Sequence, residues 1–211
     1  MSIFTDSSKQ QQSLVHGVMV ALVTDNHDPD GLGRVKVKYP TLADDEIEHW
    51  ARIAVLMAGN QRGTFFLPEV DDEVLVAFKG GDIEVPFVLG ALWNGVDAPP
   101  ETNSDGENNI RVIQSRSGHI VRLDDTGGSE KIEIIDSSGN NSITFDTANN
   151  TITLTSAQDI NLSASQGTIS LTAQSISLSS TNDTKVQAQG GLTLDGTPGT
   201  TALKGSTVNI N

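Results

Sequence analysis

The second half of the sequence repeats a pair of apolar residues, separated by one residue, at almost constant intervals. From the pair at Ile143 to the pair at Ile176, these intervals are 9, 8, 9 and 7 residues. The six clearest pairs are Ile132 and Ile134, Ile143 and Phe145, Ile152 and Leu154, Ile160 and Leu162, Ile169 and Leu171, and Ile176 and Leu178. Because successive side chains of a strand point to opposite faces, each pair predicts one short strand with one apolar face.

Small polar residues fill the intervals between the pairs. From residue 151 to residue 211, 25 of 61 residues are Ser, Thr or Asn, and five are charged. Polar sequence of low complexity is often disordered. A disordered tail has no reason to keep apolar residues at a fixed parity, so the pattern favours short strands joined by tight corners, as in a β-solenoid.

An eight-residue repeat is too short for one chain to enclose a core by itself. Burying its two apolar side chains contributes roughly 3–6 kcal/mol, whereas ordering each residue costs roughly 1–2 kcal/mol of backbone entropy. Three chains wound about one axis would supply the three sides of a narrow prism. We therefore predict an intertwined homotrimeric β-helix over residues 110–211, with the twelve paired residues as its core. A flat array of hairpins with poorly fixed register is the alternative.

The first half of the sequence has a different character. It contains eight of the nine aromatic residues and six of the seven prolines. Alternating apolar and polar residues predict short strands near residues 16–24, 34–39, 49–56, 73–78 and 87–92, which favours a five-stranded OB-fold barrel. We expect an N-terminal arm over 1–14, the barrel over 15–96 with a core of its own, and a connector over 97–109.

Composition excludes several classes of protein. The net charge of −14 argues against duplex nucleic-acid binding, which requires clustered Lys and Arg. The chain has no cysteine, so it forms no disulfide and no thiolate site. Neither an apolar leader segment nor an apolar run of about 18 residues occurs. We expect a chain that is made in the cytoplasm and stays soluble.

Candidate chemical sites are weak throughout the sequence. The run from Asn26 through Asp28 and Asp30 to Gly31 resembles the start of a calcium loop, but Pro29 interrupts it and position twelve is Val37. Two acidic runs, residues 44–46 and 71–73, lack a nearby histidine and are interpreted as solvated loops. The four histidines have no metal-ligand spacing. We predict no catalytic residue, cofactor or metal.

Several stretches of the first half resemble a known family in order and spacing. They are Gly31–Val37 (GLGRVKV), Tyr39–Pro40, Trp50–Ala54 (WARIA), Ala58–Asn60, Gly63, Phe66–Val70 (FLPEV), Glu73–Val76, Phe78, Gly80–Asp82, Pro86, Val88–Gly95 (VLGALWNG) and Pro99–Pro100. The family comprises the spike proteins of contractile injection machines: the phage baseplate assembly protein V group and the VgrG proteins of type VI secretion. The resemblance covers nearly all of residues 17–100.

The resemblance implies an OB-fold neck followed by a trimeric needle that pierces the target cell envelope when a sheath contracts. It implies a non-enzymatic structural protein, assembled into a phage tail (virion) or an injection-particle baseplate. A separate hub protein would hold it, and a PAAR-repeat protein would dock at the apex on Val208 and Ile210. No lysozyme domain fits the short connector. A monomeric β-solenoid adhesin or polysaccharide-acting enzyme is the alternative, and an OB-type nucleic-acid binder is a third.

Overall fold

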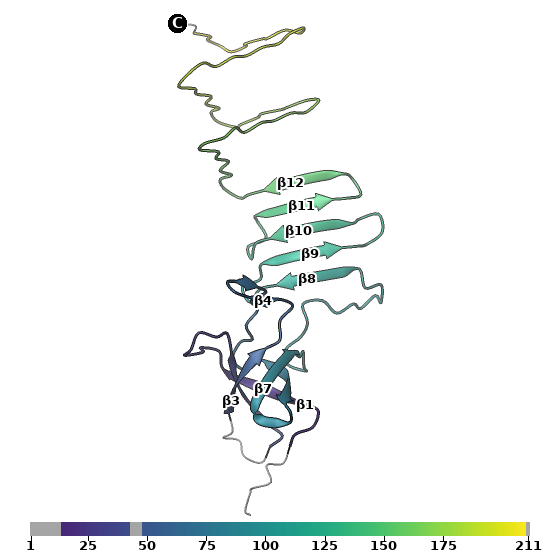
Figure 1. Cartoon of the computed structure of the whole chain (residues 1–211). Helices are drawn as coiled ribbons and strands as arrows, with labels where there is room; N and C mark the ends of the chain where they lie inside the picture. The colour runs from purple at the N-terminus through teal and green to yellow at the C-terminus, as the bar shows by residue number, and fades with distance from the viewer. Residues whose placement is uncertain (1–13, 43–47, 210–211) are drawn as a thin grey trace, which may run out of the picture. The chain divides into compact units, whose positions relative to one another are not determined.

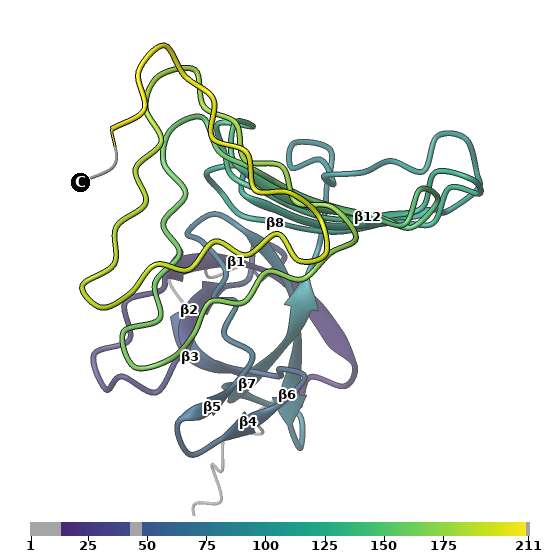
Figure 2. The same cartoon turned by 90° about the horizontal axis from the view of Figure 1, so that it is seen from above.

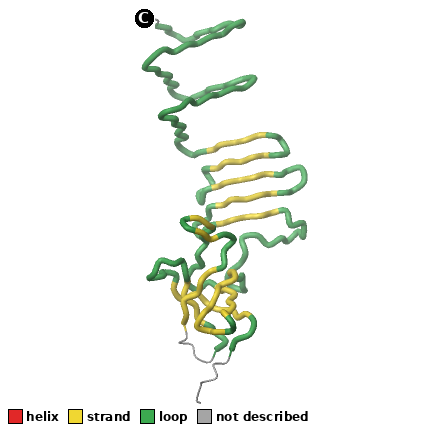
Figure 3. The backbone as a smooth tube through the Cα atoms, viewed as in Figure 1, coloured by secondary structure: helices red, strands yellow, loops and turns green. Residues whose placement is uncertain are grey.

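The computed structural model describes residues 14–42 and 48–209, and within these ranges the only regular elements are β-strands. Figure 3 shows them as two groups of strands followed by a long segment without strands. No helix that could cross a membrane occurs in the described part of the chain. An all-β fold agrees with the expectation from the alternating sequence pattern.

The first group of strands is a closed five-stranded barrel in the order β1-β2-β3-β7-β6. Its strands are β1 (Val18–Asp25), β2 (Val35–Lys38), β3 (Glu48–Ile53), β6 (Glu73–Lys79) and β7 (Asp82–Ala91), and a small hairpin of β4 (Ala58–Gly59) and β5 (Arg62–Gly63) lies between β3 and β6 in the chain. β3 and β7 pair in parallel, with Arg52 opposite Phe87, and this pairing closes the barrel. The architecture is that of an OB domain.

Strand β7 begins earlier than the sequence pattern predicts. The expected strand started at Phe87, whereas β7 starts at Asp82 and runs through Pro86. Pro86 lies opposite Phe78, next to an irregularity of the ladder with β6. Because proline cannot donate a ladder hydrogen bond, it is tolerated in a strand at such irregular positions. Gly80 and Gly81, both with positive φ, make the tight turn between the two strands.

The barrel has a core of its own, as expected, and that core is mostly aliphatic. The hydrophobic core of the described chain consists of six valines, two alanines and one tyrosine: Ala21, Val23, Val35, Val37, Tyr39, Ala51, Val74, Val76 and Val88. Phe65, Phe66 and Trp93 are exposed instead. The interior of a five-stranded barrel is narrow, and β-branched side chains from alternating positions fill most of it.

The second group of strands is an antiparallel meander in which each strand pairs with the next (Figure 1). Its strands are β8 (Ile110–Gln114), β9 (Ile120–Asp124), β10 (Lys131–Ile135), β11 (Ser142–Asp146) and β12 (Thr151–Thr155). All five strands have the same length, and the ladders from β8 to β12 are regular over all five residues. The register is therefore well defined within one chain.

The chain separates into two compact units, one that ends at Ala157 and one that begins at Gln158. The first unit contains both strand groups. The second contains no strand among its described residues. Seen from above in Figure 2, its backbone follows the sides of a wide triangular path.

Candidate functional site: an apolar sheet face without a cover

One face of the meander carries two parallel columns of apolar side chains. The ladders place Leu123, Ile132, Phe145 and Ile152 side by side in one column, and Ile113, Val121, Ile134, Ile143 and Leu154 side by side in the other. Residues at directly opposed positions of neighbouring strands share a face and lie within contact distance. The apolar pairs of the sequence thus become two continuous stripes across five strands.

These apolar stripes are exposed to solvent in the isolated chain. The exposed fraction is 43% for Ile132, 52% for Leu154 and 71% for Ile152. A soluble protein rarely exposes a continuous apolar surface of this extent unless another surface covers it. The face is therefore an interaction surface.

Six of the twelve predicted core residues lie on these stripes, namely Ile132, Ile134, Ile143, Phe145, Ile152 and Leu154. The other six lie in the second unit, and all of them are exposed: Ile160, Leu162, Ile169, Leu171, Ile176 and Leu178. Whether any of the twelve forms a trimer core stays a prediction.

The sequence reasoning missed three members of the stripes: Ile113, Val121 and Leu123. Val121 and Leu123 form an apolar pair of the same kind, separated by one residue. This pair begins eleven residues before the pair at Ile132. Their neighbour Ile120 is apolar too and faces the other side of the sheet, where it pairs with Ile135. This extra apolar residue hid the alternation.

The opposite face of the meander carries charges that alternate in sign, together with four apolar residues, Ile110, Val112, Ile120 and Ile135. Glu133 lies directly opposite Arg122, and Lys131 lies between Asp124 and Asp146 on its two neighbouring strands. Opposed charges in register stabilise neighbouring strands, whereas like charges would destabilise them. The two faces therefore have clearly different roles, and only one of them requires an apolar partner.

Polar side chains bind the turns at one end of the sheet to one another. The Asn141 side chain donates a hydrogen bond of 2.7 Å to the Asp136 carboxylate. Its carbonyl oxygen accepts hydrogen bonds from the Ser156 hydroxyl, at 3.1 Å, and from the Ala157 N–H, at 3.2 Å. The bonds from Asn141 and Ser138 hold the pKa of Asp136 below its usual value. Successive turns are thereby fixed in position.

The opposite end of the sheet is organised in the same way. Hydrogen bonds from Thr126 lower the pKa of Asp124, and hydrogen bonds from Asn149 lower the pKa of Asp146. Arg111, which begins the first column in place of an apolar residue, makes an ion pair of 2.8 Å with Asp125. These carboxylates have a structural role in the turns.

Among the described residues beyond Asp159, the backbone makes few hydrogen bonds within its own chain. Among the described residues 160–209, one hydrogen bond joins two backbone groups: the Gly167 N–H donates to the Ala164 carbonyl. Backbone N–H and C=O groups in an ordered structure are almost always paired, and extended segments pair them in ladders. The segment therefore offers its backbone groups, as well as its apolar pairs, to other strands.

The structure describes one of the two predicted docking residues at the C-terminus. Val208 is described and about half exposed, with an exposed fraction of 49%. Ile210 lies outside the described residues. Their role in binding a tip protein stays a prediction.

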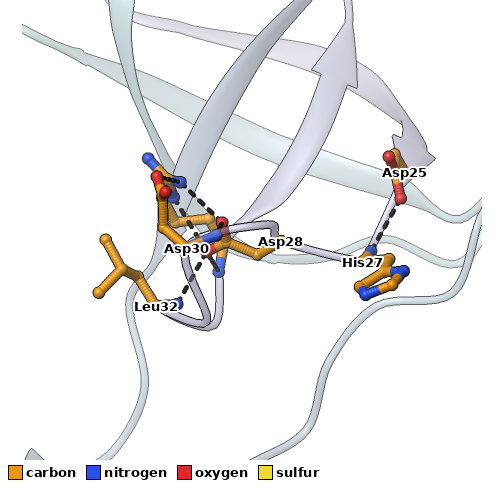
Figure 4. A network of polar contacts seen from close by, with 6 residues as sticks. Asp25, His27, Asp28, Asp30 and Leu32 are labelled. Atoms are coloured by element: carbon orange, nitrogen blue, oxygen red, sulfur yellow. Dashed lines mark hydrogen bonds and ion pairs between the residues drawn. The ribbon is translucent and has the colours of Figure 1, made fainter.

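The acidic loop that resembled a calcium loop is held by an arginine (Figure 4). Asp28 accepts two hydrogen bonds from the Arg34 guanidinium, from Nε at 3.0 Å and from Nη2 at 2.6 Å. It also accepts hydrogen bonds from the backbone N–H groups of Asp30, Leu32 and Arg34. The same guanidinium contacts Asp30 at 2.6 Å. These bonds, above all those from Arg34, hold the pKa of Asp28 far below its usual value.

The remaining polar candidates do not form a site in the described chain. Within residues 14–42 and 48–209, no three His, Asp or Glu side chains are placed to hold a metal ion. Residues 44–46, one of the two acidic runs, lie outside the described residues. In the other run, Asp72 accepts a hydrogen bond of 2.8 Å from the Glu69 N–H and shapes the loop before β6.

Comparison with known proteins agrees with the barrel. Residues 19–93 match the family described as the type VI secretion system/phage-baseplate injector OB domain. Over these residues the chain is similar to VgrG-like and phage-baseplate proteins. The match begins within β1 and ends just after β7, so it covers the barrel and none of the meander.

Curated relatives of this VgrG-like chain are much longer proteins. It is 28% identical over 130 residues to the type VI secretion system spike protein VgrG3 of Vibrio cholerae, which covers 56% of this chain and 13% of that protein. It is 30% identical over 121 residues to the type VI secretion system spike protein VgrG5 of Pseudomonas aeruginosa, and this alignment covers 54% of this chain and 14% of that protein. A third relative is the actin cross-linking toxin VgrG1 of Vibrio cholerae, which is 26% identical over 135 residues. This alignment covers 58% of this chain and 12% of that protein.

Proposed function

We propose that this chain is the central spike of a contractile tail or injection-system baseplate, acting as an intertwined homotrimer that pierces the target cell envelope. One observation carries the proposal. The apolar stripes of the meander are uncovered in one chain, and the backbone of the described residues 160–209 makes few hydrogen bonds within it; two further copies would supply partners for both.

Three copies of the apolar face would enclose a common core. Each buried Val, Leu, Ile or Phe side chain contributes roughly 1.5–3 kcal/mol when it leaves water. In the second unit, the strands of neighbouring copies would also pair the free N–H and C=O groups, leaving no lateral edge exposed. Residues 110–211 are then the needle, 15–96 the barrel, 97–109 the connector and 1–14 the arm.

The mechanical role follows from the two faces of the sheet. A dry apolar core held by interchain ladders resists bending, because sliding one chain would break many hydrogen bonds together. The outer surface, rich in Ser, Thr and Asn with alternating charges near the base, has few apolar groups that could adhere to an envelope during passage.

A spike of this kind requires partners at both ends. A baseplate hub protein would hold the barrels, and a PAAR-repeat tip protein would close the needle end on Val208 and Ile210. The assembled particle is a phage tail (virion) or an injection-particle baseplate. The names of the VgrG relatives, two of them type VI secretion spike proteins, support this placement.

We propose a non-enzymatic role for the chain. Of the carboxylates considered above that the structure describes, Asp28 and Asp30 pair with Arg34, and Asp72 shapes the loop before β6. One relative is named a toxin, and this chain aligns with 12% of that protein. A monomeric solenoid adhesin or enzyme would pair its coils within the chain, whereas the second unit contains no internal ladder among its described residues.

Solution mass is the decisive test. Light scattering is expected to give three times the 22.3 kDa of one chain, without added partner. The trimer should resist dissociation in detergent because its core and ladders are shared. A mass of one chain would overturn the proposal and favour the solenoid alternative.

A further inference from the structure

The barrel carries an exposed apolar surface that its own fold leaves uncovered. The irregular segments on either side of the β4–β5 hairpin expose Leu56, Met57, Phe65 and Phe66, with exposed fractions of 96% for Leu56 and 77% for Phe65. Together with Arg62, these residues are called the hairpin patch. Beside them is an open hollow of about 620 Å³, lined by Leu32, Ile53 and Met57 among others.

The hairpin patch is free of negative charge in a strongly acidic protein. Residues 49–68 contain Arg52 and Arg62 but no Asp or Glu, although the chain has 27 acidic residues. Arg52 lies over the Phe87 ring at 4.6 Å. Arg62 is exposed and has no ion-pair partner among the described residues.

A second exposed surface of the same compact unit has the complementary character. Residues 93–109, called here the neck segment, expose Trp93 at 70% and Val96 at 91%. From residue 97 to residue 109 the segment has four acidic residues and no Lys or Arg, and Glu101 is exposed. One surface is therefore apolar and basic, and the other is apolar and acidic.

We propose that the hairpin patch of one copy packs against the neck segment of the next copy, so that three such contacts form a collar around the base of the needle. This inference rests on the proposed trimer. A three-fold assembly requires a heterologous contact, in which two different surfaces of each chain meet those of its neighbours. Trp93 and Val96 enter the hollow, and Arg62 meets the carboxylates around Glu101.

The distribution of charge favours a second copy of this chain as the partner that covers the hairpin patch. Three chains of −14 each repel one another, and the hairpin patch is a surface at which they can approach without opposing like charges. Tryptophan and arginine are also the residues that most often dominate interface energies. The collar would extend the needle core toward the barrels and align the three barrels with the needle.

The lack of cysteine makes the contact directly testable. The full chain with Arg62→Cys and Glu101→Cys is treated with a short bismaleimide and run on a denaturing gel. We expect covalent trimers, because each chain is linked to both neighbours. The matched control replaces Arg62→Cys by Lys79→Cys, an exposed cation outside the patch, and should give at least tenfold fewer trimers.

Charge reversal provides the second measurement. In a chain with Met57→Cys and Val96→Cys, Arg62→Glu should lower the yield of cross-linked trimer at least threefold, and adding Glu101→Lys should restore it. A chain that is trimeric by light scattering but gives only monomeric cross-linked products overturns the collar and leaves the spike proposal intact. A monomeric chain overturns the spike proposal, and the collar with it.

Discussion

His119 accepts a hydrogen bond of 3.1 Å from the backbone N–H of Ser137 through its Nδ1 atom, which joins the turn before β9 to the turn after β10. The two residues are 18 positions apart in the sequence. This contact belongs to the same series of turn bonds as Asn141 with Ser156. It gives the edge of the meander a second set of connections besides the ladders.

Removing this imidazole is expected to loosen one turn without disrupting the sheet. A single lost hydrogen bond of this kind costs about 0.5–1.5 kcal/mol. In His119→Ala, the amide hydrogen of Ser137 should therefore exchange with solvent about three- to tenfold faster. His27→Ala is the control and should leave this rate unchanged, because His27 donates a hydrogen bond to Asp25 through its backbone N–H and not through its ring. An unchanged exchange rate in His119→Ala would contradict the contact.

The two faces of β12 should respond oppositely to a charge. Leu154 lies on the apolar stripe beside Ile143, and its neighbour Thr153 lies on the polar face beside Thr144. A buried unpaired carboxylate costs several kcal/mol, so Leu154→Asp is expected to reduce the chain from trimer to monomer. Thr153→Asp should remain trimeric. Solution mass by light scattering compares them, and equal masses for the two variants would contradict the assignment of faces.

Asp28 should make the barrel sensitive to acid. Because its pKa is lower in the folded chain than in the unfolded chain, its stabilising effect is complete above the unfolded value of about 4. The effect is lost as the pH falls below that value toward the folded pKa. Asp28→Asn should thus lower the melting temperature at pH 7 and flatten its decline in acid.

Asp30→Asn is the matched control for that experiment. Asp30 makes one contact with the same guanidinium, and its side chain is 64% exposed. It should lower the melting temperature less than Asp28→Asn, because exposed ion pairs contribute little. If the two variants were equally destabilised, the central position of Asp28 in the loop would be refuted.

Tyr39 offers a spectroscopic test of the barrel core. It is the only tyrosine of the chain, so phenolate absorbance reports on it alone. Burial raises the pKa of Tyr39 to about 12. The titration midpoint should therefore lie about two pH units above that of free tyrosine, and the barrel should lose stability as the pH rises from about 10 toward 12. A midpoint near 10 in the folded chain would contradict the burial of this ring.

Much of the fold could be predicted because its signals are local. Alternation at β2 and β6 follows from side-chain parity alone, and the apolar pairs predict which residues share a face. The acidic loop at Asp28 could be rejected as a calcium site from Pro29 and Val37. Its actual role could not be predicted, because it depends on how Arg34 folds back onto the loop.

By itself, the sequence determined that the chain is all-β, that its halves differ, and that pairs such as Ile152 and Leu154 lie on one face. The tertiary structure decided which residues oppose one another and which side chains stay uncovered. It filled most of the narrow barrel interior with valines, admitted the Tyr39 ring, and left Phe65 and Phe66 outside. The face of the strand on which a side chain lies follows from the alternation of the backbone. Whether that side chain is buried depends on distant segments that meet in space, and no local pattern encodes that.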